Sequence, residues 1–215
     1  PKHSLEVAGL MEEEGSRFPS GCQGSRAICG TLKEEDLEEL SRDGVTLREA
    51  LLSAGYQPEA LKSVKRDDIR AIVELHIEQG ADLEERGLTC GAVTAIVGYD
   101  RLFLTLHGEA NHAGTTSMRR RRDALAAAAE VILGVKELAE ADDRFVATVG
   151  QLNVTPNAVN IVPGKVQLAI ETRAADDRVL AEVRAKIVSL LERTASKSGV
   201  VITKENDFHV AAVPL

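Results

Sequence analysis

Apolar and polar positions alternate most regularly in the second half of the chain. Every second residue from 102 to 106 is Leu, and the residues between them are Phe and Thr, a period of two that predicts a strand with one buried face. Residues 145–154 and 166–172 show the same alternation. The short apolar run at 200–202 predicts a last strand.

Two segments between these strands repeat their apolar residues at steps of three and four, as amphipathic helices do. The first covers residues 123–139, with an expected buried stripe of Leu125, Ala128, Ala129, Ile132, Val135 and Ala139. The second begins at a capping Asp176 or Asp177 and ends at Gly199, with a stripe of Leu180, Val183, Ile187, Leu190 and Leu191. The order β-α-β-β-α-β predicts a ferredoxin-like domain at residues 91–208, with both helices on one face of a four-stranded antiparallel sheet.

Residues 1–90 have a weaker pattern and predict a separate, less complete unit. The first 30 residues are rich in Gly, Ser and Glu, which favours loops. Residues 32–55 predict two short amphipathic helices, the second capped by Thr46. The apolar stretch at 69–77 fits either a helix end or a buried strand, and we favour a strand at 73–77.

Composition and charge narrow the class of protein. The 215 residues carry 34 acidic and 26 basic side chains, and the formal net charge of −8 argues against a nucleic-acid partner. Aromatic residues make up only 3%, so the core must be aliphatic, as in helices packed on a sheet. No apolar run approaches the roughly 20 residues that cross a bilayer, so no membrane partner is expected.

The cysteines and the chain ends give two further expectations. Cys22, Cys29 and Cys90 form no CxxC pair and no disulfide framework, so the simplest interpretation is a reducing, cytoplasmic location. The first residue is not Met, and the last three, Val-Pro-Leu, follow no polar tail. Both ends look like cuts through a longer protein.

Two motifs in the first unit could bind a metal. Glu12-Glu13-Glu14-Gly15 could simply be a solvated acidic face. Adjacent carboxylates before a Gly can also have different roles, one as a metal ligand and the other as a general base. His76 lies in an apolar stretch, where a core histidine is the more common interpretation, although imidazole is also a frequent metal ligand. Two ligands fall short of the three that a catalytic zinc-type site needs.

Two motifs in the second unit could bind a small anion. Residues 108–118 place small residues around His112 before a helix, which suits either a turn with a helix cap or an oxyanion-binding loop. The four Arg residues at 119–122 oppose the helix dipole and are expected to have acidic partners, either on the protein or on a ligand. Asn160, in the Asn-rich loop 155–164, and Arg173, at a strand end, could be ordinary surface residues or could bind a carboxylate.

Taken together, these motifs resemble the M20 family of metal-dependent amidohydrolases, in the branch of N-carbamoyl-L-amino acid hydrolases, β-ureidopropionases and allantoate amidohydrolases. The resemblance rests on Glu-Glu-Gly-Ser-Arg-Phe, Glu-Leu-His-Ile-Glu-Gln-Gly, Asn-His-Ala-Gly-Thr-Thr and Asn-Ala-Val-Asn-Ile-Val-Pro-Gly, in the family's order and with about its spacing. It implies an α/β protein: residues 1–90 are part of a metal-binding catalytic domain, residues 91–208 are an inserted α+β lid for dimerisation, and residues 209–215 return to the catalytic domain.

The resemblance also implies roles for single residues. Glu13 is the expected general base, and Glu14 and His76 are expected ligands of a centre of two divalent metals (Zn, Mn, Co or Ni). His112, Asn160 and Arg173 are expected to hold a small carbamoyl or ureido substrate, in a site assembled across a homodimer. Family members are roughly twice this long, and the further metal ligands, an upstream His and Asp and a downstream His, are absent here. The chain therefore looks like the middle of an amidohydrolase, and by itself it is expected to bind metal weakly or not at all.

Two other interpretations remain open from the sequence. One is that the chain acts only as a dimerisation or binding module without catalysis. The other is an M20 aminopeptidase, which the Asn-His-Ala-Gly-Thr-Thr segment favours less. The sequence does not separate a carbamoyl amino acid from allantoate or β-ureidopropionate as the substrate.

Overall fold

The computed structural model describes residues 3–215 and divides the chain into two compact units, one ending at Gln79 and the other beginning at Gly80. The division falls earlier than the domain boundary expected at residue 90. Each unit has its own hydrophobic cluster. No helix among residues 3–215 is long and apolar enough to cross a membrane.

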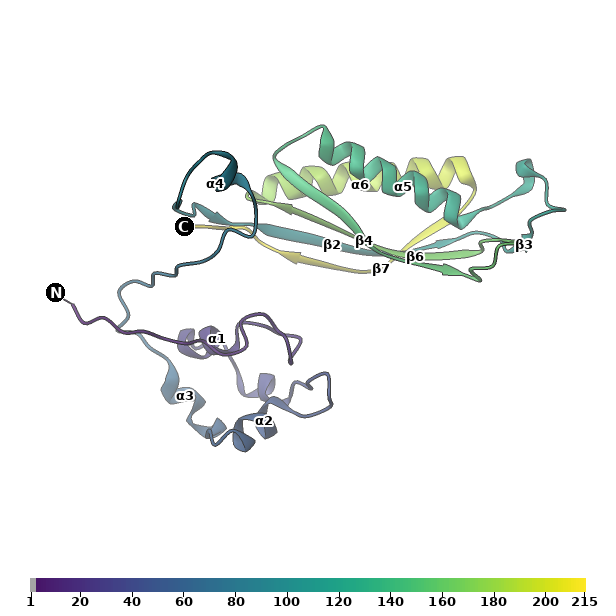
Figure 1. Cartoon of the computed structure of the whole chain (residues 1–215). Coiled ribbons are helices and arrows are strands. Elements are labelled where there is room, and N and C mark those ends of the chain that lie inside the picture. Colours follow the sequence, from purple (N-terminus) through teal and green to yellow (C-terminus); the bar gives the residue numbers. More distant parts are fainter. Residues whose placement is uncertain (1–2) are drawn as a thin grey trace. The chain divides into compact units, whose positions relative to one another are not determined.

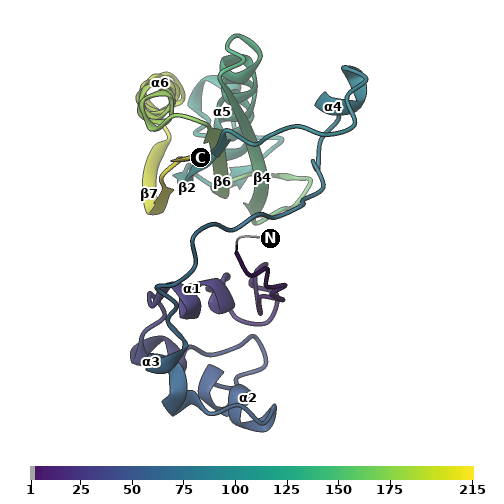
Figure 2. The ribbon, with the colours of Figure 1, turned by 90° about the vertical axis from the view of Figure 1, so that its left-hand side faces the viewer.

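The second unit is built on a four-stranded sheet covered on one face by two helices (Figure 1). Its main elements are β2 (Gly98–His107), α5 (Ala124–Glu140), β4 (Phe145–Thr155), β6 (Lys165–Ala174), α6 (Asp177–Ser198) and β7 (Val201–Val210). The strands lie in the order β4-β6-β2-β7, and every neighbouring pair is antiparallel. Figure 2 shows the unit from its end, with α5 and α6 on the same side of the sheet. This confirms the ferredoxin-like order and the mixed α/β class expected from the sequence.

Two short strand pairs and two short helices complete this unit. β1 (Ala95–Ile96) pairs with β8 (Val213–Pro214), and β3 (Asn111–His112) pairs with β5 (Ile161–Val162). The short helices are α4 (Asp82–Glu85) and the 3₁₀ helix η3 (Met118–Arg120). The β3–β5 pair is the one that matters for the site, because it joins two of the loops singled out in the sequence.

The long helices begin and end where their capping residues predict. Asp123 accepts hydrogen bonds from two backbone N–H groups of α5, and Asp176 accepts one from the N–H of Arg178 at the start of α6. Gly199 ends α6 at a φ of 67°, a left-handed conformation that glycine adopts without steric cost.

The buried face of α5 differs from the expected stripe. Ala124, Ala127, Ala128, Val131 and Val135 are buried. Leu125 and Ala129, which the periodicity placed inside, are exposed. Because Ala occupies five positions in the first turns, two faces satisfy the same periodicity, and the sheet packs against the one with the smaller side chains. The stripe expected for α6 is buried at Leu180, Val183 and Ile187.

The first unit consists of short helices around a small core of Phe18, Leu37 and Leu47. Its elements are α1 (Gln23–Cys29), the 3₁₀ helices η1 (Glu34–Glu38) and η2 (Pro58–Ala60), α2 (Leu47–Ser53) and α3 (Leu61–Val64). Thr46 caps α2 as expected, accepting a hydrogen bond from the N–H of Glu49 at 3.1 Å. The other expected helix is only the 3₁₀ helix η1.

The prediction of a strand at 73–77 is wrong. Residues 65–78 form neither helix nor strand. The side chains of Val73, Leu75 and Ile77 are 95%, 97% and 76% exposed. A strand needs a neighbour for its backbone hydrogen bonds, and no segment among residues 3–215 pairs with this one.

Candidate substrate-binding site

The acidic motif of the first unit is a tight loop closed by Glu12. This residue has a φ of 52°, and its carboxylate accepts hydrogen bonds from the backbone N–H groups of Arg17 and Phe18 and from the Ser16 hydroxyl. The Phe18 N–H, followed by the Ser16 hydroxyl, lowers the pKa of Glu12 below its ordinary value. The acidic run alone does not distinguish Glu12 from its neighbours, but in the structure Glu12 fixes the backbone that carries the next two acids.

Glu13 and Glu14 project from this loop with exposed side chains. The carbonyl of Glu13 accepts a hydrogen bond from the Cys22 N–H at 3.1 Å. Neither carboxylate is bonded to any group that the structure describes. Gly15 follows at a φ of 62°, and a Cβ there would come within 3.1 Å of the Phe18 carbonyl oxygen. The tight turn therefore requires glycine and leaves both carboxylates accessible.

His76 is exposed in the irregular segment after the helices. Its Nδ1 lies 2.5 Å from the carbonyl oxygen of Ile77. Because a carbonyl can only accept, Nδ1 carries the proton and Nε2 keeps a free lone pair, which is the form that binds a metal.

The described residues do not by themselves form a metal centre. Within residues 3–215, no three His, Cys, Asp or Glu side chains come together as ligands. Glu14 and His76 are two suitable donors, whereas a catalytic zinc-type site takes three from the protein. The donor set of this chain therefore does not fit a binuclear centre without further ligands.

The structure brings His112 and Asn160 together. His112 pairs with Ile161 across β3 and β5, and the N–H of Ala113 donates to the carbonyl of Asn160 at 2.9 Å. The N–H of Gly114 donates to Nδ1 of His112 at 3.1 Å. In the neutral imidazole the proton is then on Nε2, so this edge can donate a hydrogen bond to a ligand, the opposite arrangement from His76.

Arg121 holds this loop, a role the sequence did not reveal. Its Nε and Nη2 donate to the carbonyls of Thr116 and Ala113 at 3.1 and 2.5 Å. Among the described residues none of these four arginines forms an ion pair, so the expected acidic partner is not on this part of the protein, and an acidic ligand stays a prediction. The pattern of four basic residues could not indicate that one of them binds backbone carbonyls.

Arg173 lies on the face of the sheet that no helix covers. Its Nε donates to Oε1 of Glu171 at 2.6 Å, and its guanidinium carbon is 5.8 Å from the centre of the Tyr99 ring. Burial works to raise the pKa of Glu171, but hydrogen bonds from Arg101 and Arg173 outweigh it, and the pKa lies below its ordinary value. Glu171 is thus ionised at neutral pH beside two guanidinium groups.

Within one chain, Arg173 is remote from His112 and Asn160. The His112 loop adjoins the start of β6, where Gly164 accepts a hydrogen bond from the N–H of Gly108, whereas Arg173 is near the other end. At about 3.3 Å per residue, Lys165 and Arg173 are about 26 Å apart along the strand. A small molecule cannot span this distance, so the three expected substrate-binding residues form two separate groups.

Comparison with known proteins shows which families and structures this chain is similar to. Residues 94–199 match the peptidase dimerisation domain of the M20 type. The chain is 39% identical to an allantoate amidohydrolase of Bacillus subtilis, covering all of this chain and 53% of that protein. It is 41% identical to an N-carbamoyl-L-amino acid amidohydrolase of Geobacillus stearothermophilus, covering 98% of this chain and 52% of that one.

A solved structure shows the same fold. A hydantoinase/carbamoylase family amidase from Burkholderia multivorans superposes with a TM-score of 0.85 at 35% identity, covering 95% of this chain and 50% of that one. The chain thus spans about half the length of the curated relatives it matches. The resemblance inferred from the four sequence motifs is confirmed.

Proposed function

The chain contains the M20 peptidase dimerisation domain within a sequence related to amidohydrolases, and we propose that it is part of an enzyme hydrolysing the carbamoyl (ureido) C–N bond of a small carboxylate-bearing substrate. N-carbamoyl amino acids and allantoate are the substrates that the relatives' names suggest. The three free cysteines, Cys22, Cys29 and Cys90, support a reducing, cytoplasmic location for this enzyme.

The observation that carries the proposal is the pairing of the His112 loop with the Asn160 loop. This pairing joins the two loops through their backbones, and the side chains of His112 and Asn160 are both exposed on them. An imidazole N–H and an amide suit a ureido group, because its carbonyl oxygen accepts and its nitrogens donate. Arg173 would bind the substrate carboxylate. Glu13, free of other contacts among the described residues, would take a proton from the attacking water and deliver it to the leaving nitrogen.

We further propose that the site is shared between two copies in a homodimer. The separation of Arg173 from the His112 loop supports this, because one molecule of substrate could touch both groups only if they came from different chains. A symmetric dimer would form two such composite sites. Strands β4 and β7 are at the edges of the sheet, where unpaired backbone groups favour association.

The resemblance to the M20 family implies two divalent metal ions, and we include them in the proposal, with Glu14 and His76 as two of their ligands. Bound metal would polarise the ureido carbonyl. We expect the remaining ligands from residues outside these 215, because no group of three His, Cys, Asp or Glu side chains comes together among the described residues. The metal, whether Zn, Mn, Co or Ni, is open.

The alternative function is a dimerisation or binding module without catalysis. It is favoured by the same shortage of metal ligands. Metal content and ureide hydrolysis separate the two: a stoichiometric two-metal load with hydrolysis supports the enzyme, and a metal-free, inactive dimer supports the module.

The decisive variants are Glu13→Gln and Glu14→Gln, made in a protein that contains this chain together with the remaining ligands. Glu13→Gln should keep the metal and lower the release of ammonia from an N-carbamoyl amino acid by about 10²–10⁴-fold, the usual contribution of a general base. Glu14→Gln should lose metal first. Equal metal loss in both variants, or full activity in either, would contradict the assignment.

A further inference from the structure

Four side chains form a square on the open face of the sheet, around Arg173. In the β2–β6 register, Tyr99 is opposite Arg173 and Arg101 is opposite Glu171. The two arginines therefore occupy one diagonal, and Tyr99 and Glu171 occupy the other. Each arginine contacts both residues of the other diagonal: the guanidinium carbons of Arg101 and Arg173 are 4.6 and 5.8 Å from the Tyr99 ring centre.

The carboxylate of Glu171 is divided between the two arginines. Nε of Arg101 donates to Oε2 at 2.5 Å, and Nε of Arg173 donates to Oε1 at 2.6 Å. The Glu171 side chain is 27% exposed, against 42% for Arg101 and 47% for Arg173. The acid thus lies lower on the sheet, and the two guanidinium groups stand more exposed above it.

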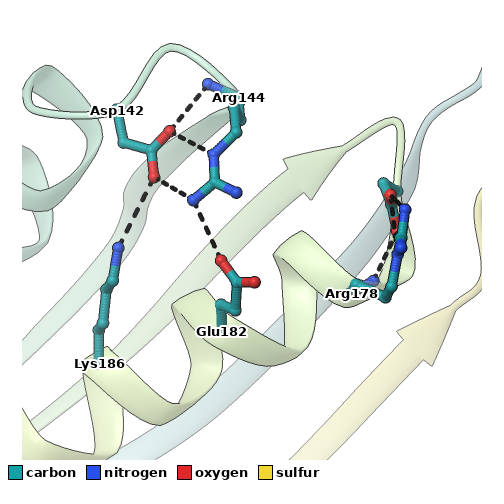
Figure 3. Close-up of polar contacts among 6 residues, drawn as sticks. Asp142, Arg144, Arg178, Glu182 and Lys186 are labelled. Carbon is teal, nitrogen blue, oxygen red and sulfur yellow. Dashed lines mark hydrogen bonds and ion pairs between the residues drawn. The ribbon is translucent and has the colours of Figure 1, made fainter.

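Two other Arg–carboxylate pairs in this chain, those of Arg144 and Arg66, are built differently. In Figure 3, Arg144 uses both Nε and Nη2 to bind the two oxygens of Asp142, at 2.9 and 2.8 Å. Arg66 binds Asp68 in the same two-pronged way, at 2.6 and 2.8 Å. This bidentate geometry is the strongest for a guanidinium and a carboxylate. It occupies the Nε and Nη2 edge of the guanidinium, which is then not available to a ligand.

Arg173 does not form such a bidentate pair, because the second oxygen of Glu171, Oε2, is bound by Arg101. Among the groups that the structure describes, neither Nη of Arg173 has a hydrogen-bond partner. The charges agree with this arrangement: two guanidinium groups and one carboxylate leave one positive charge in excess, whereas Glu171 and Arg173 alone would neutralise each other.

We propose that Arg101 is a positioning residue for the carboxylate site: by binding Oε2 of Glu171, it keeps Glu171 from pairing bidentately with Arg173 and leaves the Nη groups of Arg173 for the substrate carboxylate. This inference rests on the role of Arg173 in the proposed function. In this proposal Arg101 acts through Glu171 and not by contact with the ligand.

The first test needs no ligand and uses the full 215-residue chain. In Arg101→Met, both oxygens of Glu171 become available to Arg173, so its guanidinium should become bidentate and rotate more slowly. NMR of the arginine side-chain nitrogens would then show the Nη hydrogens of Arg173 resolved in Arg101→Met and averaged in the parent chain. Averaged signals in both proteins would overturn the proposal.

The second test is a titration with N-carbamoylglycine. Arg101→Met should weaken binding about tenfold, equivalent to one charge-assisted contact. Adding Glu171→Gln to this variant should restore the affinity, because a neutral amide no longer sequesters Arg173. Arg101 is exposed enough that methionine should be tolerated, and thermal unfolding of each variant checks this.

The outcomes separate two kinds of failure. Unchanged binding in Arg101→Met, or weakened binding that Glu171→Gln does not restore, overturns the positioning role while leaving Arg173 in place. If Arg173→Met binds N-carbamoylglycine as well as the parent chain, or if the parent chain does not bind it, the role of Arg173 in the proposed function fails, and this inference fails with it.

Discussion

Replacing Arg121 with methionine should loosen the loop that holds His112 while leaving the rest of the fold intact. The guanidinium donates to the carbonyls of Ala113 and Thr116 at 2.5 and 3.1 Å. Methionine keeps much of the alkyl chain and removes both donors. The change therefore tests whether these two hydrogen bonds order the loop.

The magnitude follows from the number and kind of hydrogen bonds lost. A hydrogen bond from a charged donor contributes about 1.5–3 kcal/mol. Because Arg121 is only half-buried and the freed carbonyls can bind water, we take about 2–3 kcal/mol for the pair. This corresponds to about a 30- to 150-fold increase in the population of the open loop.

Amide hydrogen exchange at Ala113 and Thr116 measures that population directly. Their N–H groups donate to the carbonyls of Asn160 and His112 at 2.9 and 3.1 Å, so exchange requires the loop to open. In Arg121→Met both amides should exchange about 30- to 150-fold faster, with little change in the global Tm. Arg120→Met, at an exposed neighbour, is the matched control and should exchange as the parent does. Unchanged exchange in Arg121→Met would refute the role of the two hydrogen bonds.

Three further outcomes follow from the packing and the loop contacts. Leu180→Ala, at a fully buried position, should lower the free energy of unfolding in urea by about 2–5 kcal/mol, whereas Leu133→Ala, 58% exposed, should change it by less than about 0.5 kcal/mol. Thr46→Ala should cost the first unit about 1 kcal/mol, and Thr46→Ser should retain the cap. Because the pKa of Glu12 is lowered in the folded loop, its stabilisation is complete above the unfolded pKa of about 4.3 and is lost as the pH falls through the lower folded value. The amide hydrogen of Phe18 should therefore exchange faster as the pH falls through that range, after correction for the intrinsic exchange rate. Glu12→Gln should remove this pH dependence.

The ferredoxin-like unit was predictable because its signals are local and agree with one another. The alternation at 102–106 and the caps Asp123, Asp176 and Gly199 each specify an element without reference to distant residues. The face of α5 was not predictable, since many small residues satisfy the same periodicity and only packing against the sheet decides between the faces.

The sequence motifs named the residues of the candidate site, whose roles stay predictions, and indicated their arrangement only in part. The motifs indicated His112 and Asn160, and the β3–β5 pairing places them together. That Arg121 binds carbonyls and that Glu171 is shared between two arginines depends on contacts across the fold, which no local pattern reports. The segment 73–77 was predicted wrongly for a related reason: its apolar sequence suits a strand, but a strand also needs a partner.

If one substrate molecule is held by residues of two copies, then mixing two defective variants should restore part of the binding. His112→Ala and Arg173→Met should each fail to bind N-carbamoylglycine. After the variants are mixed and exchange subunits, half of the symmetric dimers should be mixed and should contain one intact composite site, giving about a quarter of the parent's binding capacity. No recovery in the mixture, or full binding by either variant alone, would contradict the shared site.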